Sequence, residues 1–135
     1  MLDRPYRFEI SKHGDHRGLL NSIELPFEIS RVYYIQNSGD LSRGHHAHKT
    51  LKQIFFCLAG SCVLTISTPN ETLEFRIQAH DDPIVVPHGY WRVLSDFSYD
   101  CTLVVMASDH YDELDYIRDY DEYLRWFESR EQDES

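Results

Sequence analysis

Short runs of β-branched and aromatic residues, separated by turn residues, are the feature that most restricts how this chain folds. The apolar positions of most of the chain recur with the period of a strand. These runs predict strands within residues 31–37, 53–60, 61–67, 72–78, 81–89, 91–98 and 101–108. Turn signals recur between them at Gly39, Gly60, Pro69-Asn70 and His88-Gly89. This close spacing predicts an all-β antiparallel sandwich or small barrel, because βαβ units would need long helical runs between the strands.

The pattern changes only near the end of the chain. Within residues 116–129 the apolar residues Ile117, Tyr120, Leu124 and Phe127 repeat at helical spacing, with acidic residues between them. We therefore expect a short C-terminal helix that covers one face of the sheets. The 135 residues suit one domain spanning 1–135.

Composition narrows the classes of partner. The formal net charge of −10 argues against a general binder of nucleic acids or membranes, because both are polyanionic. An anionic ligand must then meet a local cluster of arginines. No apolar run reaches the roughly 18 residues of a membrane span, and the opening MLDRPYRFEI lacks the apolar stretch of a signal peptide. We expect a cytoplasmic protein.

The three cysteines, Cys57, Cys62 and Cys101, lie in apolar, strand-like contexts and are odd in number. Both observations favour reduced core residues over a disulfide framework. A redox or metal-ligand role is the alternative.

The histidine-rich stretch RGHHAHKTLKQ, residues 43–53, carries the strongest chemical signal. In a strand His46 and His48 face the same side, so both imidazoles can point into a barrel, while His45 and Ala47 face outward. A metal site would need an acidic residue a few positions later. That position holds Gln53.

Two motifs of the cupins, a family of small jelly-roll barrels, are recognisable around these residues. The first has the form G-x5-H-x-H-x3-4-E-x6-G and the second G-x5-P-x-G-x2-H-x3-N. They are matched here by His46, His48, Gln53 and Gly60, and by Pro87, Gly89 and Arg92. Two metal ligands are replaced, because Gln53 stands for the glutamate and Arg92 for the last histidine. Two imidazoles alone hold a divalent ion poorly, and a guanidinium has no lone pair to donate. The pattern predicts a site without metal or cofactor, in which two histidines exchange protons and an arginine stabilises developing negative charge.

Longer stretches resemble one group of cupins nearly from end to end. The stretches are R-V-Y-Y-I at 31–35, R-G-x-H-A-H-K at 43–49, C-L-x-G-S-C at 57–62 and A-S-D-x-Y-D-E-x-D-Y-I-R-D-Y-D-E-Y-L at 107–124. They are similar to the sugar 3,4-ketoisomerases, the WxcM-like or FdtA-like cupins. The resemblance implies an isomerase that moves the keto group of dTDP-4-keto-6-deoxyglucose from C4 to C3, on the way to 3-amino-3,6-dideoxy sugars of bacterial surface polysaccharides. It also implies a homodimer with exchanged N-terminal strands, and pairing would protect the strand-like segments RFEIS and NSIEL from aggregation.

The resemblance also assigns roles to residues. His48 is the candidate base at C3, His46 a second acid–base or positioning group, and Tyr34 a hydrogen-bond donor or proton relay. Trp91 either stacks on the substrate or packs in the barrel. The expected substrate-binding residues are Arg92, Arg43, Arg31, Arg17, Trp91 and Gln53. Arg92 would face the hexose, and Arg43 and Arg31 would contact the pyrophosphate or support the site.

The configuration of the product and the class of enzyme have alternatives. Arg92 matches the members that form gluco-type products, whereas Arg17 matches the galacto-type group; Arg92 is expected nearer the hexose, so we favour the gluco-type product. A nucleotide-sugar 3,5-epimerase would use a His–Asp dyad and a tyrosine acid, and the sequence suggests no such dyad. A metal-dependent cupin dioxygenase is disfavoured by Gln53 and Arg92. A sugar-binding cupin without catalytic activity is the third alternative.

Overall fold

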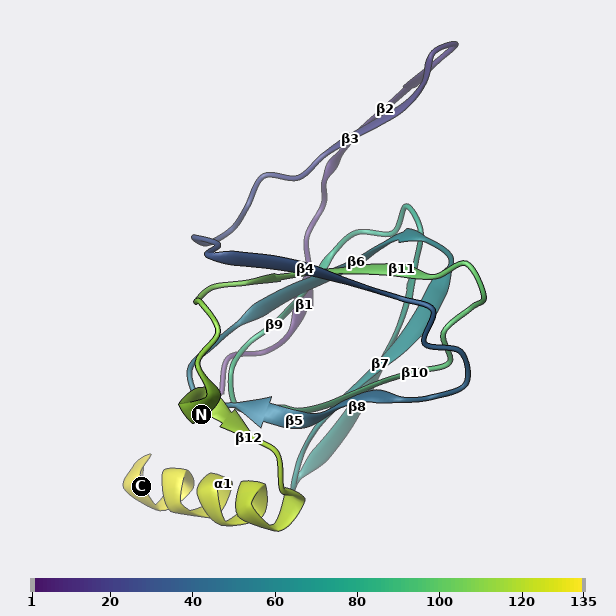
Figure 1. Ribbon diagram of the computed structural model, residues 1–135. Coiled ribbons are helices and arrows are strands. Elements are labelled where there is room, and N and C mark those ends of the chain that lie inside the picture. The colour runs from purple at the N-terminus through teal and green to yellow at the C-terminus, as the bar shows by residue number, and fades with distance from the viewer. Residues whose placement is uncertain (1, 135) are drawn as a thin grey trace.

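Two five-stranded antiparallel sheets pack face to face in the computed structural model, which describes residues 2–134 (Figure 1). The first sheet has the order β1 (Tyr6–Arg7), β9 (Ile84–Val86), β6 (Gln53–Ala59), β11 (Thr102–Ala107) and β4 (Arg31–Gln36). The second has the order β12 (Tyr116–Ile117), β5 (Arg43–His48), β10 (Trp91–Ser95), β7 (Ser61–Thr68) and β8 (Glu71–Gln78). All seven predicted strand segments contain a strand, and the all-β, cupin-like architecture is confirmed.

The main core lies between the two sheets. It is formed by side chains that alternate inward along each strand, among them Phe55, Leu64, Ile66, Leu103 and Val105. The three cysteines belong to this core as free, buried thiols, as the sequence predicts. Their burial raises the pKa of the Cys101 thiol to about 12, so this thiol is protonated at neutral pH.

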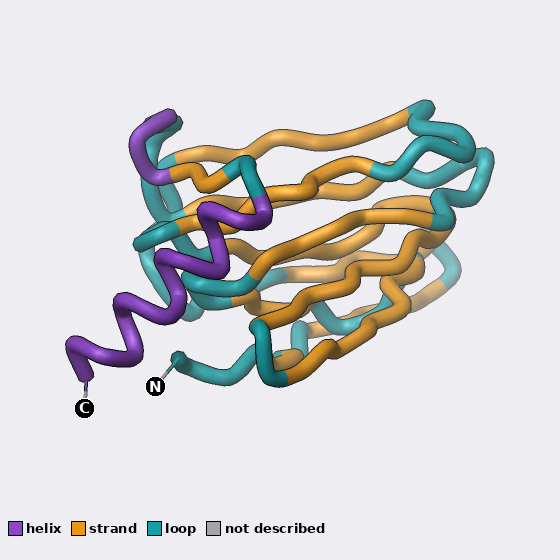
Figure 2. The backbone as a smooth tube through the Cα atoms, turned by 90° about the horizontal axis from the view of Figure 1, so that it is seen from below, coloured by secondary structure: helices purple, strands orange, loops and turns teal. Residues whose placement is uncertain are grey.

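A helix covers the outer face of the second sheet. Helix α1 (Tyr120–Glu134) begins after Asp119, whose carboxylate accepts a hydrogen bond from the Glu122 N–H at 3.0 Å. Figure 2 shows the helix crossing one side of the strand layer. In the described part of the chain, no helix is long and apolar enough to cross a membrane.

The predicted apolar face of this helix is partly wrong. Ile117 precedes the helix and lies in β12, where it pairs with Ala47 of β5. Tyr120 is exposed, and the buried helical residues are Tyr123 and Phe127, which pack with Ala47 and Ile117. The sequence has apolar residues at helical spacing on both sides of the strand-to-helix boundary. Periodicity alone therefore predicted a helix that begins too early in the chain.

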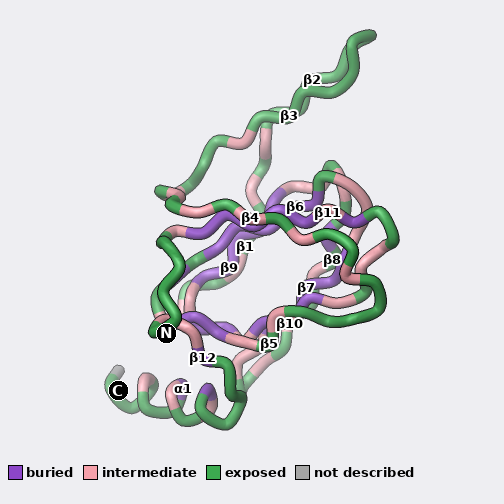
Figure 3. The backbone as a smooth tube through the Cα atoms, in the orientation of Figure 1, coloured by how far each residue is buried: buried purple, intermediate pink, exposed green. Residues whose placement is uncertain are grey.

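A hairpin projects away from the sheets. It consists of β2 (Ser11–Asp15) and β3 (Gly18–Ser22), and all residues of both strands are exposed (Figures 1 and 3). A two-stranded hairpin is marginally stable in water by itself. Leu19 and Leu20, each more than 60% exposed, are apolar residues left on its surface.

Candidate active site

A β-bulge turns the histidine strand toward the barrel interior. The pairing of β5 with β10 shifts by one residue between Gly44 and His46, and His45 is the extra residue, with a φ of 55°. Gly44 has a φ of 92°, and a Cβ at this position would lie 3.0 Å from the Arg92 carbonyl oxygen. Glycine is therefore required where β5 approaches β10 so closely.

Beyond the bulge, His46 and His48 point to the same side, as the sequence predicts. Their Nε2 atoms lie 3.2 Å apart, within hydrogen-bond distance. His48 is fully buried and His46 is half-buried, while Ala47 faces the opposite side under helix α1 and His45 is exposed. The tyrosine ring of Tyr116 lies 4.4 Å from the His48 ring and 5.0 Å from the His46 ring.

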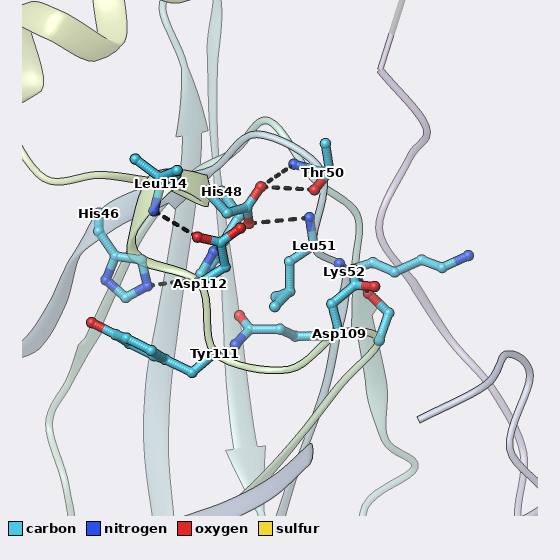
Figure 4. Close-up of polar contacts among 12 residues, drawn as sticks. His46, His48, Thr50, Leu51, Lys52, Asp109, Tyr111, Asp112 and Leu114 are labelled. Atoms are coloured by element: carbon cyan, nitrogen blue, oxygen red, sulfur yellow. Dashed lines mark hydrogen bonds and ion pairs between the residues drawn. The ribbon is translucent and has the colours of Figure 1, made fainter. Parts of the chain in front are cut away.

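Asp115, a residue that the sequence analysis missed, binds the other nitrogen of His48. Its Oδ2 lies 3.0 Å from His48 Nδ1. The pairing of β12 with β5, which places Tyr116 opposite His48, brings this carboxylate to the histidine across 67 residues of sequence. Figure 4 shows His46 and His48 together with the N–H groups of Thr50 and Leu51, which donate to the same carboxylate. The expectation that the chain lacks a His–Asp dyad is therefore wrong.

The surroundings keep both imidazoles neutral near pH 7. Burial, and next the positive charge of Arg92, lower the pKa of His46 to about 4. The same two causes, in the same order, lower the pKa of His48. A neutral imidazole is the form that can accept a proton.

A buried hydrogen-bonded chain lies beside the histidines. Arg92 faces His46 across the β5–β10 pair, and it donates to the Gln53 side-chain oxygen and, at 3.3 Å, to the Tyr90 carbonyl. The Gln53 amide in turn donates to the hydroxyl of Tyr33 at 3.1 Å. Burial lowers the pKa of Arg92 to about 10, which leaves it cationic at neutral pH. Its Nε is buried and has no protein partner among the described residues.

This donor set does not suit the metal-dependent cupin chemistry considered as an alternative. Gln53 gives its oxygen to Arg92, and the permanently charged guanidinium stands where a third imidazole would be required. Within residues 2–134, Cys57, Cys62 and Cys101 are the only group of three or more His, Cys, Asp or Glu side chains close enough to share an ion. Their sulfur atoms lie in the apolar core, away from the histidines.

Arg31 is placed as a candidate anion contact. Its guanidinium lies 5.3 Å from the Tyr33 ring centre and 5.6 Å from that of Tyr111. Nε and Nη2 are buried and have no hydrogen-bond partner in the described chain. An unpaired buried guanidinium is costly, so a bound anion would stabilise it.

Four predicted site residues are not brought to this cluster. Tyr34 is 69% exposed, because residues alternate along β4 and Tyr33 takes the inward position. Trp91 alternates in the same way with Arg92, and its ring contacts those of Tyr120 and Tyr123 outside the barrel. The other two are exposed: Arg17 is paired with Asp15 on the projecting hairpin, and Arg43 lies at the start of β5.

Two packed antiparallel sheets that carry paired imidazoles on β5 and a buried arginine on β10 define a cupin. Residues 6–128 match the family described as FdtA: WxcM-like, C-terminal. The chain belongs to this family, the dTDP-6-deoxyhexose 3,4-ketoisomerases.

Individual proteins to which this chain is similar are also named as 3,4-ketoisomerases. A TDP-4-oxo-6-deoxy-α-D-glucose-3,4-oxoisomerase of Aneurinibacillus thermoaerophilus is 43% identical over 117 residues, which cover 83% of this chain and 84% of the relative. Structures of the 3,4-ketoisomerase QdtA of Thermoanaerobacterium thermosaccharolyticum, with TDP and, for a mutant, with TDP-4-keto-6-deoxyglucose, superpose with a TM-score of 0.89, 36% identity and coverage of 96% and 98%. The TDP-quinovose 3,4-ketoisomerase WlaRB of Campylobacter jejuni has a TM-score of 0.84, 36% identity and coverage of 92% and 99%.

Proposed function

We propose that this chain converts dTDP-4-keto-6-deoxyglucose into a dTDP-3-keto-6-deoxyhexose by proton transfer between its own side chains and the sugar. The observation that carries the proposal is the pair of neutral imidazoles, with Nε2 atoms 3.2 Å apart, beside a buried guanidinium. Family membership supports the substrate, because QdtA was solved with TDP-4-keto-6-deoxyglucose and the chain is 36% identical to it.

The reaction needs no oxidant. The C4 carbonyl acidifies the C3–H bond, and His48 Nε2 removes that proton to leave an enediolate across C3 and C4. O4 then takes a proton, the O3–H proton is lost as the C3 carbonyl forms, and a proton is returned to C4. His46, in contact with His48, is placed to exchange protons during these steps.

The cationic and hydroxyl groups around the pair stabilise the charge that develops. Arg92 is desolvated, so its attraction for an enediolate oxygen is stronger than it would be in water. Tyr33, which accepts a hydrogen bond from Gln53, retains its own O–H to donate to a sugar oxygen, a role that we transfer to it from Tyr34. Arg31 would pair with the diphosphate.

We also propose a gluco-type product. Arg92, the residue associated with that group, is buried and lies opposite His46 on the neighbouring strand. The similarity to a TDP-quinovose 3,4-ketoisomerase supports this choice. We expect the 3-keto product to be aminated at C3 in a cytoplasmic route to 3-amino-3,6-dideoxy sugars.

The exposed hairpin supports the proposal of a homodimer with exchanged N-terminal strands. Strands β2 and β3 bury none of their residues within one chain, although Leu19 and Leu20 are apolar. Strand β4 is an edge of the first sheet and exposes Val32 and Tyr34. Docking the hairpin on a second copy would cover such surfaces and remove an open edge.

Proton NMR of the product formed from dTDP-4-keto-6-deoxyglucose tests the activity and the C4 configuration together. A 3-keto product is expected, whereas a 3- or 5-epimer would favour the epimerase alternative, and unchanged substrate would favour a sugar-binding cupin. His48→Asn should lower turnover by roughly 10²- to 10⁴-fold, the usual contribution of a general base, with little change in affinity for dTDP. The turnover of His46→Asn should fall less than that of His48→Asn if His46 mainly positions the substrate.

His45→Asn is the matched control, because His45 is exposed on the other side of the strand and asparagine tolerates its positive φ. In D₂O the wild type should place deuterium at C4. If one shielded imidazole carries the same proton between the two carbons, the deuterium is missing and the product is galacto-type, because such a transfer stays on one face of the ring. Near-normal turnover of His48→Asn would move the base to His46 or Tyr33.

A further inference from the structure

Asp115, the last residue of the short 3-10 helix η1 (Glu113–Asp115), accepts hydrogen bonds on both carboxylate oxygens and on its backbone oxygen. Its Oδ1 accepts hydrogen bonds from the Thr50 N–H at 2.8 Å and from the Thr50 hydroxyl at 2.7 Å. Its Oδ2 accepts from the Leu51 N–H at 3.3 Å, and its backbone oxygen accepts from the Lys49 N–H at 3.0 Å. These donors fix the carboxylate in one position, before any ligand binds.

The fixed carboxylate determines which nitrogen of His48 carries hydrogen. An ionised carboxylate only accepts hydrogen bonds, so the His48 Nδ1 at 3.0 Å from Oδ2 must be the N–H. A neutral imidazole has one N–H, so His48 Nε2 has the free lone pair. The alternative tautomer would place two acceptors against each other at Nδ1.

The same logic extends to His46. The Nε2 atom of His46 lies 3.2 Å from the Nε2 atom of His48, which carries a lone pair. This contact is favourable only if His46 Nε2 carries the hydrogen. The lone pair of His46 is then on Nδ1. That atom is buried and has no hydrogen-bond partner in the described residues.

We infer that Asp115 is a positioning residue that sets the tautomers of both histidines, with His48 as the base through Nε2 and His46 as the N–H donor beside it. The inference rests on the proposed function for its catalytic meaning. In this arrangement the substrate displaces the His46 N–H from the lone pair of His48. The released N–H is then free to donate to an oxygen at C3 or C4 of the sugar.

Nitrogen-15 NMR of histidine-labelled protein near neutral pH tests the tautomers directly, without substrate. In the wild type we expect a pyrrole-type Nδ1 and a pyridine-type Nε2 for His48, and the opposite for His46. Asp115→Asn should shift His48 toward the Nε2–H form, because the amide can present its NH₂ group to Nδ1. Turnover should fall on the order of 10²-fold while KM changes little, as expected when a group that orients a functional histidine is removed.

Asp112→Asn is the matched control. Asp112 is exposed, lies on the same short segment and caps the Leu114 N–H, which an asparagine side chain can also do. This variant removes the same charge as Asp115→Asn, but Asp112 binds the Leu114 N–H and not His48, so both the tautomers and the turnover should be kept. A loss of turnover in Asp112→Asn as large as that in Asp115→Asn would overturn the inference, because general charge would then explain the effect.

The spectrum of the wild type decides the inference even if Asp115→Asn fails to fold. A pyridine-type Nδ1 on His48 overturns it, and the expected pattern supports it. The proposed function fails separately, if the wild type forms no 3-keto product while the tautomers are as expected. Unchanged turnover and unchanged tautomers in a folded Asp115→Asn protein would also overturn the inference.

Discussion

Acidification should destabilise this protein through His46 well before its ordinary carboxylates protonate. Burial and Arg92 lower the pKa of His46 from 6.5 to about 4 in the folded state. In the unfolded chain the pKa returns to about 6.5. Between these two values the unfolded state binds a proton that the folded state does not, so stability falls as the pH falls from 6.5 toward 4.

The size of the effect follows from the difference between the two pKa values. At about 1.36 kcal/mol per pKa unit, His46 alone should cost about 2 kcal/mol at pH 5 and about 3 kcal/mol once the pH is below 4. His48, whose pKa is lowered by the same causes, acts in the same direction. This is a large part of the stability of a small domain, which is typically about 5–15 kcal/mol.

Urea unfolding near pH 7.5 and near pH 5 measures this loss. His46→Asn removes the titrating group, so the difference between the wild type and the variant separates His46 from the carboxylates. The same argument applies to catalysis: kcat/KM should retain its value down to about pH 5, because the imidazoles are already deprotonated. An acid limb near pH 6.5, or an identical pH dependence of stability in His46→Asn, would refute the assigned environment.

Four further results are expected. Elemental analysis should find no stoichiometric transition metal, and activity should survive EDTA; about one metal per chain, with activity lost on chelation and restored by that metal, would contradict this. Light scattering should give a dimer, and a mass near 16.0 kDa at micromolar concentration would reject it. Tyr33→Phe should lower turnover by removing the hydroxyl beside Gln53, whereas Tyr34→Phe should leave turnover unchanged; the reverse result would return the role to Tyr34. Gly44→Ala should lower turnover and destabilise the fold more than Gly39→Ala does. Gly39 also has a positive φ, but a Cβ there would meet no atom within 4 Å, so only the backbone strain of about 1–2 kcal/mol is expected. Equal losses of stability in unfolding experiments would show that the contact with the Arg92 backbone is unimportant.

The sequence predicted the scaffold better than the partners of the catalytic groups. Strand periodicity was sufficient for the sheets, and a two-residue spacing was sufficient to place His46 and His48 on one face. Periodicity could not decide between Tyr33 and Tyr34, because these identical side chains lie on opposite faces of β4. Only the register of β4 with β11 shows which of the two points inward. Asp115 was missed because its contact with His48 depends on a two-residue strand, β12, that has no periodicity of its own. Its place within the long C-terminal motif was the only available signal.

The His48–Asp115 pair cannot separate a ketoisomerase from a 3,5-epimerase, since both reactions begin with removal of a proton next to a carbonyl. The second step differs. An epimerase returns the proton to the same carbon from the opposite face of the ring, and so needs an acid across the sugar from its base. A 3,4-ketoisomerase returns it to the neighbouring carbon. The two imidazoles here are in contact on one wall, with Nε2 atoms 3.2 Å apart, an arrangement that suits removal of the proton at C3. In the gluco configuration H3 and H4 lie on opposite faces of the ring, so the proposed gluco-type product requires return of the proton to C4 from the other face, whereas return on the same face would give the galacto-type product. The carbon that receives the proton, rather than the His48–Asp115 pair, therefore separates isomerisation from epimerisation in this site.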